Sequence, residues 1–238
     1  MTDPSFLVGY GQYVQRTMEN AEATHWNQSV REEVANSVSH GLGLVAAAIG
    51  TPILLVAAWK RSTLPFAIGS AVLATTVLLL YLGSTLYHAW PRSALKSVLQ
   101  VVDHSAIFLL IAGTYTPFTL GPLHGRLGWF ILALVWALAL GGVISKTRKG
   151  ARHRPRLAIA LYLGMGWLIM LAIRPLAAAV PLATLVWLIA GGLTYTAGVV
   201  FFVREHVRYS HFIWHLFVLG GMLCHYLAIF SYAASRSS

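Results

Sequence analysis

Seven long apolar segments, separated by short polar breaks, constrain this chain more than any other feature of its sequence. Each segment has about 18–24 residues, enough for an α-helix to cross a hydrocarbon core of about 30 Å. The segments run over residues 38–59, 65–88, 103–120, 125–145, 155–174, 181–203 and 211–233. We therefore expect an all-α, polytopic membrane protein with seven transmembrane helices.

The composition agrees with this fold class. Of the 238 residues, 57% are hydrophobic and only 10% are charged, which excludes an ordinary soluble domain. The net charge is +10, but the basic residues sit in short loops and form no basic face, so we expect no binding of nucleic acid. The single cysteine excludes an intramolecular disulfide. No basic stretch followed by an apolar segment opens the chain, so no cleaved signal peptide is expected.

The distribution of basic residues predicts the orientation. Seven spans put the two termini on opposite sides, and the N-terminal side carries twelve Lys and Arg residues against five on the other. The positive-inside rule then predicts a multi-pass protein of the cell inner (plasma) membrane, with its N-terminus in the cytoplasm and its C-terminus outside. The loop over residues 146–156 supplies half of the majority. It is interpreted as a topological anchor, with contact to anionic headgroups as the alternative.

The chain divides into an N-terminal cytoplasmic or interfacial segment, residues 1–32, and a seven-helix transmembrane domain, residues 33–238. Residues 13–36 are polar, and we expect a short interfacial helix there, anchored at the headgroups by Trp26.

Two histidines open the last apolar segment. His211 and His215 are four residues apart, so on a helix they lie on one face, where both imidazoles can bind one metal ion. Histidine is costly inside a membrane segment, which makes such a pair a candidate functional site.

Other polar residues are predicted to reach the same membrane depth, at the cytoplasmic side. The second segment ends there and the third and seventh begin there. The residues concerned are Glu33, Asn36 and His40 before the first span, Ser84 and His88 at the end of the second, and Asp103 at the start of the third.

These residues together suggest a zinc site. Three neutral imidazoles, from His88, His211 and His215, suit zinc and leave a fourth position for water, whose pKa zinc lowers to about 7. Asp103 is the one carboxylate within or at the edge of a span, and it can orient that water and take its proton, or fix a ligand imidazole. Ser84 lies on the face of His88, although its hydroxyl can instead bond its own helix backbone.

Four residues have weaker assignments. Glu33, Asn36 and His40 form one helical stripe that supports the site or, on spacing alone, faces solvent or caps a helix. His225 lies about 15 Å beyond His215 along the helix and is expected to be remote from the metal.

The motifs together resemble the haemolysin III family, the bacterial branch of the progestin and adipoQ receptor superfamily. The matching motifs are Glu33-x-x-Asn36-x-x-x-His40-Gly41, Ser84-x-x-x-His88, Asp103-His104, Ile111-Ala-Gly-Thr-Tyr-Thr-Pro117, His211-x-x-x-His215 and His225-Tyr226. The resemblance implies seven helices with the N-terminus inside and zinc held by His88, His211 and His215. It also implies that Asp103 lies near the zinc-bound water and Ser84 beside the site. Relatives in the superfamily are linked to ceramide hydrolysis.

Three classes of function follow. The leading one is a zinc-dependent, ceramidase-like hydrolase that cleaves an amide or ester of a membrane lipid at the cytoplasmic leaflet. The second is a receptor-like or membrane-homeostasis sensor in which zinc is structural, although structural zinc usually has four protein ligands. A transporter or a cytolytic pore ranks lower, because spans 4 to 6 offer almost no polar lining.

Overall fold

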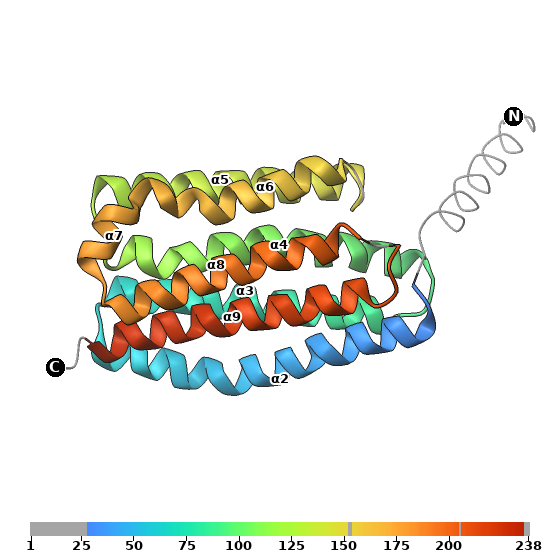
Figure 1. Ribbon diagram of the computed structural model, residues 1–238, viewed down its shortest axis with the longest axis horizontal. Helices are drawn as coiled ribbons and strands as arrows, with labels where there is room; N and C mark the ends of the chain where they lie inside the picture. The colour runs from blue at the N-terminus through green and yellow to red at the C-terminus, as the bar shows by residue number, and fades with distance from the viewer. Residues whose placement is uncertain (1–27, 152–153, 205, 236–238) are drawn as a thin grey trace, which may run out of the picture.

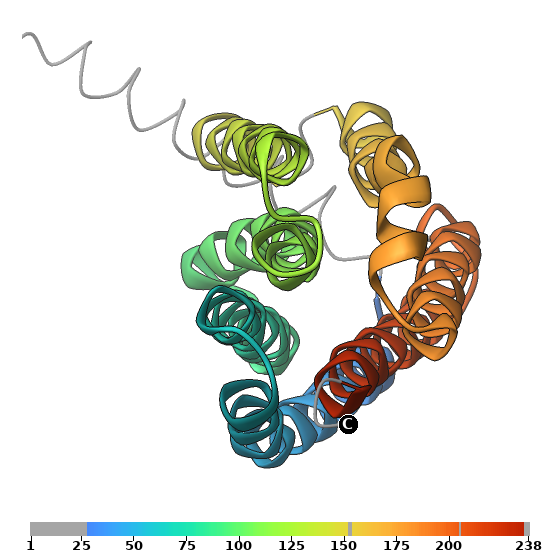
Figure 2. The ribbon, with the colours of Figure 1, turned by 90° about the vertical axis from the view of Figure 1, so that its left-hand side faces the viewer.

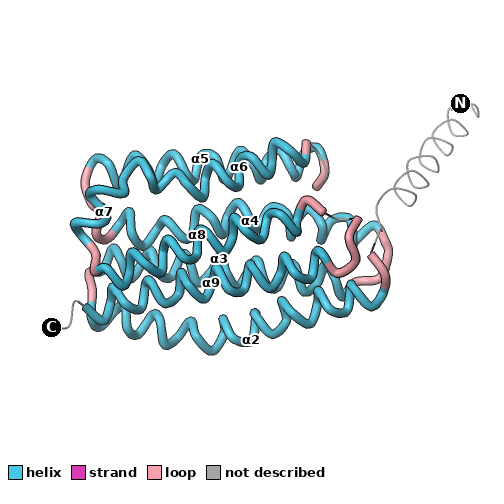
Figure 3. The backbone as a smooth tube through the Cα atoms, viewed as in Figure 1, coloured by secondary structure: helices cyan, strands magenta, loops and turns pink. Residues whose placement is uncertain are grey.

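The computed structural model describes residues 28–151, 154–204 and 206–235, and within these ranges it contains helices and no strand (Figures 1 and 3). The elements are α2 (Val30–Arg61), α3 (Leu64–Ala89), α4 (Ala94–Leu120), α5 (Arg126–Lys149), α6 (Pro155–Trp167), the 3-10 helix η1 (Leu168–Ala172), α7 (Ile173–Ala179), α8 (Leu182–Phe202) and α9 (Ser210–Ser235). Counting residues 155–179 as one span, seven helical segments of this described part are long and apolar enough to cross a membrane. The predicted all-α fold with seven spans is confirmed.

The spans form a ring around a central space. Viewed along the bundle, α5, α4, α3, α2, α9 and α8 follow one another, and α6 lies between α5 and α8 (Figure 2). Neighbours from α5 through α2 to α8 pack closely, whereas α6 contacts α5 and α8 only sparsely. Segments far apart in the sequence, such as α2 and α9, therefore lie side by side.

Two glycines allow α3 and α4 to approach closely. A Cβ on Gly69 would lie 2.6 Å from the Cα of Pro117, and a Cβ on Gly113 would lie 2.2 Å from Thr76 Oγ1. Such distances are possible only without a side chain, a common device where membrane helices pack. This packing sets His88, at the end of α3, beside the first turns of α4.

Two helices begin earlier than the hydropathy predicted. α2 starts at Val30 with a capping box, in which Ser29 Oγ accepts from the Glu32 amide and Glu32 Oε2 accepts from the Ser29 amide. Glu33 and Asn36 therefore lie inside the first membrane helix and not before it. α4 starts at Ala94, nine residues before the expected position. Hydropathy missed this first part of the helix because the residues that it buries are polar.

The interfacial helix expected over residues 13–36 can be judged only in part. Residues 30–36 belong to α2 itself, which corrects the prediction for that stretch. Trp26 and the rest of residues 13–27 lie outside the described residues.

The fifth span is interrupted, which the sequence analysis did not predict. Its α-helix ends at Trp167, continues as η1 and resumes as α7. The Tyr115 hydroxyl, from α4, meets the backbone groups that the interruption frees. Its oxygen lies 2.6 Å from the Met165 carbonyl and 2.8 Å from the Gly166 carbonyl, and it accepts from the Ile169 amide at 2.9 Å. Backbone groups at membrane depth need such partners.

Candidate metal centre

Three histidines from two helices meet at the end of the bundle where α2 and α9 begin. His88 lies in the last turn of α3, and His211 and His215 lie in the first two turns of α9. One ring nitrogen from each lies within 4.8 Å of the other two, and these three form a group able to hold a metal ion. His88 is 3% exposed and His215 is 1% exposed, whereas His211 is half-buried with its Nε2 atom withdrawn from solvent.

Hydrogen bonds at the Nδ1 atoms orient two of the rings. His88 Nδ1 lies 2.7 Å from Glu33 Oε2, and His215 Nδ1 lies 3.2 Å from the Asn36 carbonyl oxygen and 3.1 Å from Ser39 Oγ. A carboxylate and a carbonyl oxygen only accept, so both Nδ1 atoms carry the proton. The lone pair of each neutral ring is then on Nε2, the state that binds a metal.

The remaining nitrogens fit a metal ion. Within the described ranges, His88 Nε2 and His211 Nε2 are buried and have no hydrogen-bond partner. Buried polar atoms almost always have a partner, so two unpaired nitrogens in one group suit the coordination of a metal ion. Metal–nitrogen bonds near 2.0–2.1 Å place tetrahedral ligand atoms about 3.3 Å apart, and the ring nitrogens here lie within 4.8 Å of one another.

Asp103 and Ser84 lie next to this group. Asp103 is 7% exposed and lines the same cavity as His211 and His215. The Ser84 side chain is fully buried, and its hydroxyl lies close to the Asp103 carboxyl group. A carboxylate is therefore available beside the three histidines and at the wall of a cavity.

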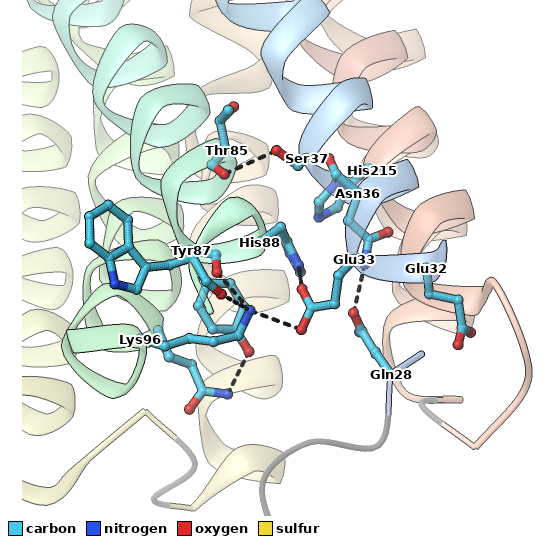
Figure 4. A network of polar contacts seen from close by, with 12 residues as sticks. Gln28, Glu32, Glu33, Asn36, Ser37, Thr85, Tyr87, His88, Lys96 and His215 are labelled. Atoms are coloured by element: carbon cyan, nitrogen blue, oxygen red, sulfur yellow. Dashed lines mark hydrogen bonds and ion pairs between the residues drawn. The ribbon is translucent and has the colours of Figure 1, made fainter. Parts of the chain in front are cut away.

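The three residues of the predicted helical stripe, Glu33, Asn36 and His40, all contact the histidine group. Glu33 contacts His88, and Asn36 contacts His215 through its carbonyl while its amide nitrogen donates to Gln28 Oε1 at 2.7 Å (Figure 4). His40 stacks on the His215 ring. They face the interior of the bundle, so the solvent-facing alternative is wrong for Asn36 and His40, which are 0% and 3% exposed.

Sequence reasoning missed Lys96, which it used only as a topological charge. Lys96 is 2% exposed, and its Nζ lies 3.0 Å from Glu33 Oε1 (Figure 4). Lys96, Gln100 and Asp103 are spaced at i, i+4 and i+7, and all three are buried. That spacing is the signal of one helical face. This spacing was not used in the prediction, because the third span was expected to begin at Asp103, which placed Lys96 and Gln100 outside the helix.

An apolar cavity extends from the histidine group along the bundle axis. Its wall includes Asp103, His211 and His215 at one end and His225 further along α9. Between them the lining is mainly aliphatic and aromatic, and includes Leu80, Leu110, Phe118, Leu188 and Val218. His225 stacks on Tyr195, with 5.5 Å between ring centroids, and is not among the metal-binding group of the described residues.

Comparison with known proteins identifies the family of the chain. Residues 28–226 match the family model described as "Haemolysin-III related". The chain belongs to the haemolysin III family. It is 40% identical over 215 residues to Hemolysin-3 of Bacillus cereus, covering 90% of this chain and 98% of the relative. It is 39% identical over 204 residues to the Hemolysin-3 homolog of Bacillus subtilis (strain 168), covering 86% and 95%.

A more distant haemolysin III relative is the human Monocyte to macrophage differentiation factor, 31% identical over 214 residues and covering 84% of each chain. This similarity fits the progestin and adipoQ receptor superfamily. Seven apolar helices and membership of the haemolysin III family together identify the chain as an integral membrane protein.

Proposed function

We propose that this protein is a zinc-dependent hydrolase that cleaves an amide or ester bond of a membrane lipid. The observation that carries the proposal is a group of three histidines, two of which, His211 and His215, line an apolar cavity together with the buried carboxylate of Asp103. The cavity is long and apolar, which suits an acyl chain, and its only charged lining residue among the described part of the chain is Asp103. A substrate held this way has its polar linkage at the histidines.

The ligand set favours a catalytic ion over a structural one. His88, His211 and His215 supply three nitrogens, and catalytic zinc commonly has three protein ligands and one open position. When bound, zinc supplies an acidic water near neutral pH and polarises a carbonyl oxygen. The burial of His88 and His215 limits the access of competing solvent.

The residues around the proposed metal have two roles, proton transfer and positioning. Asp103 accepts the proton of the attacking water and returns it to the leaving group, since it is the carboxylate at the cavity wall. The buried Ser84 hydroxyl, which has no hydrogen-bond partner among the described residues, lies beside the Asp103 carboxyl group on the neighbouring helix and is available to orient it. Asn36 and Glu33 hold the rings of His215 and His88 through their Nδ1 atoms.

We further propose that the site faces the cytoplasmic leaflet of the inner membrane, with the N-terminus in the cytoplasm. The support is the excess of basic residues at the site's end of the bundle. Lys96 and Lys146 are exceptions to the charge count, because both are buried, but ten of the twelve remain against five.

A second candidate is a receptor-like or homeostatic sensor. It is favoured by one observation: the polar network around the histidines joins α2, α3, α4 and α9, so a metal there would stabilise the bundle. In that case hydrolysis would be absent.

The test is lipid hydrolysis by purified, zinc-loaded protein in nanodiscs. Ceramides, diacyl phospholipids and lysophospholipids would be incubated with wild type and with Asp103→Asn, and released fatty acid measured by mass spectrometry. We expect release by wild type alone, with equal zinc in both proteins. No release from any amide or ester lipid would reject the hydrolase and favour the sensor.

A further inference from the structure

Glu33 links two groups that lie on different helices. One carboxylate oxygen, Oε2, lies 2.7 Å from His88 Nδ1, and the other, Oε1, lies 3.0 Å from Lys96 Nζ (Figure 4). The carboxylate, on α2, thus bridges the last turn of α3 and the first turn of α4. Its side chain is 18% exposed, so the two contacts are mostly withdrawn from solvent.

Lys96 is itself held in place. Its Nζ donates to the Tyr87 carbonyl at 2.9 Å and to the Trp90 carbonyl at 3.1 Å, both at the C-terminal end of α3. A lysine at a helix C-terminus satisfies carbonyls that have no intrahelical donor. Because Lys96 is anchored at two points, it fixes the position of the Glu33 carboxylate, and its positive charge favours the ionised form of that carboxylate.

We infer that Glu33 is a positioning residue for the metal. It holds the His88 ring so that Nε2 points at His211 and His215, and its charge makes that nitrogen a stronger donor. Carboxylates bound to the far nitrogen of a ligand imidazole act in this way at other metal sites. The inference rests on the proposed metal site, and it does not depend on whether the bound metal hydrolyses a lipid.

The preceding residue provides a matched control. Glu32 lies in the same first turn of α2 and carries the same charge. Its Oε2 accepts from the Ser29 amide at 2.9 Å and the Ser29 hydroxyl at 2.7 Å, and its Oε1 accepts from the Tyr209 amide at 2.8 Å. Glu32 therefore caps α2 and ties it to the loop before α9, and it has no contact with a histidine nitrogen among the hydrogen bonds of the described residues.

The experiment compares full-length wild type with Glu33→Gln and Glu32→Gln. For each, zinc affinity is measured by competition with a chelator, the visible spectrum is recorded with cobalt in place of zinc, and the melting temperature is measured without metal. Glutamine keeps the size of the side chain and removes its charge. We expect Glu33→Gln to bind zinc about 10–100-fold more weakly and to shift the cobalt absorption. Glu32→Gln should melt at a lower temperature while its zinc affinity and cobalt spectrum match wild type.

The outcomes separate the two proposals. If wild type binds neither zinc nor cobalt, the metal site is wrong and this inference fails with it. If wild type binds zinc and Glu33→Gln binds it equally with an unchanged cobalt spectrum, the metal site survives and the positioning role is wrong. Should Glu33→Gln not fold, Glu33→Asp decides: it keeps the charge but has a shorter reach, and wild-type affinity together with a wild-type cobalt spectrum would overturn the inference.

Discussion

His40 lies flat against His215, with ring centroids 3.6 Å apart and ring planes 6° apart. Both ring nitrogens of His40 are buried and have no hydrogen-bond partner among the described residues. His40 therefore contacts His215 through the face of its ring, and it packs against a residue proposed as a metal ligand.

This stacking predicts different effects for two substitutions of His40. His40→Ala removes a stacked pair worth about 0.5–1.5 kcal/mol and leaves a cavity beside His215, so we expect a lower melting temperature. His40→Phe keeps a ring and removes two unpaired nitrogens, so its melting temperature should equal or exceed that of wild type. Equal destabilisation by both variants would argue that the His40 nitrogens have a polar partner, such as a water or a metal ion.

The three ligand histidines should be individually required for metal binding. We expect about one zinc per chain in wild type, and His88→Ala, His211→Ala and His215→Ala should each lose most of it. Because the proposed ion would join α3 to α9, loss of zinc should also lower the melting temperature, and a chelator should have the same effect on wild type. Elemental analysis and thermal melting measure the two quantities. Full zinc occupancy in His88→Ala would contradict the assignment of three ligands.

Asp103 should differ from the histidines. Asp103→Asn keeps the shape of the side chain but removes its charge, so we expect most of the zinc to remain and any lipid hydrolysis to disappear. Zinc content and fatty-acid release are measured on the same preparation, with His211→Ala as the reference for loss of a ligand. If Asp103→Asn loses zinc as completely as His211→Ala, Asp103 is itself a ligand.

The close contact of α3 with α4 predicts the cost of a single methyl group. Gly113→Ala would force a Cβ to within 2.2 Å of Thr76 Oγ1, and overpacking of this kind costs about 1–3 kcal/mol. Gly141→Ala, in the exposed part of α5, meets nothing within 4 Å and serves as the control. Thermal melting should show destabilisation by the first substitution and none by the second. Equal melting temperatures would mean that α3 and α4 can separate without cost.

The orientation can be tested with two single cysteines in a background lacking Cys224. His124 and Thr147 lie at opposite ends of α5, and both are exposed. With the N-terminus inside, a membrane-impermeant thiol reagent should label His124→Cys in intact spheroplasts and Thr147→Cys only after lysis. The reverse pattern would place the histidine group at the outer leaflet.

Much of this architecture is predictable from local sequence. Hydropathy predicts the seven spans, because a membrane helix needs a long apolar run. The spacing of His211 and His215 predicts that they share a face, and both do contribute to the group with His88. These features follow from the sequence of a single helix or from the order of the spans along the chain.

Other features that depend on contacts between helices were not predicted. Lys96 is polar, so hydropathy assigned it to a loop, whereas partners on α2 and α3 allow it to be buried. The interruption of the fifth span at η1 depends on Tyr115 of another helix, and nothing in residues 155–179 specifies that partner. The contact of Glu33 with His88 likewise could not be predicted from the spacing of Glu33, Asn36 and His40 alone.

The metal centre draws on both ends of the chain, since His88 comes from the second span and His211 and His215 from the seventh. During synthesis, His88 enters the membrane while more than half of the polypeptide has still to be translated. A complete donor set cannot exist until the last helix has inserted and docked beside α2. Loading with the proposed ion would therefore be a terminal event in biogenesis, and a chain truncated before α9 would lack two of the three donors.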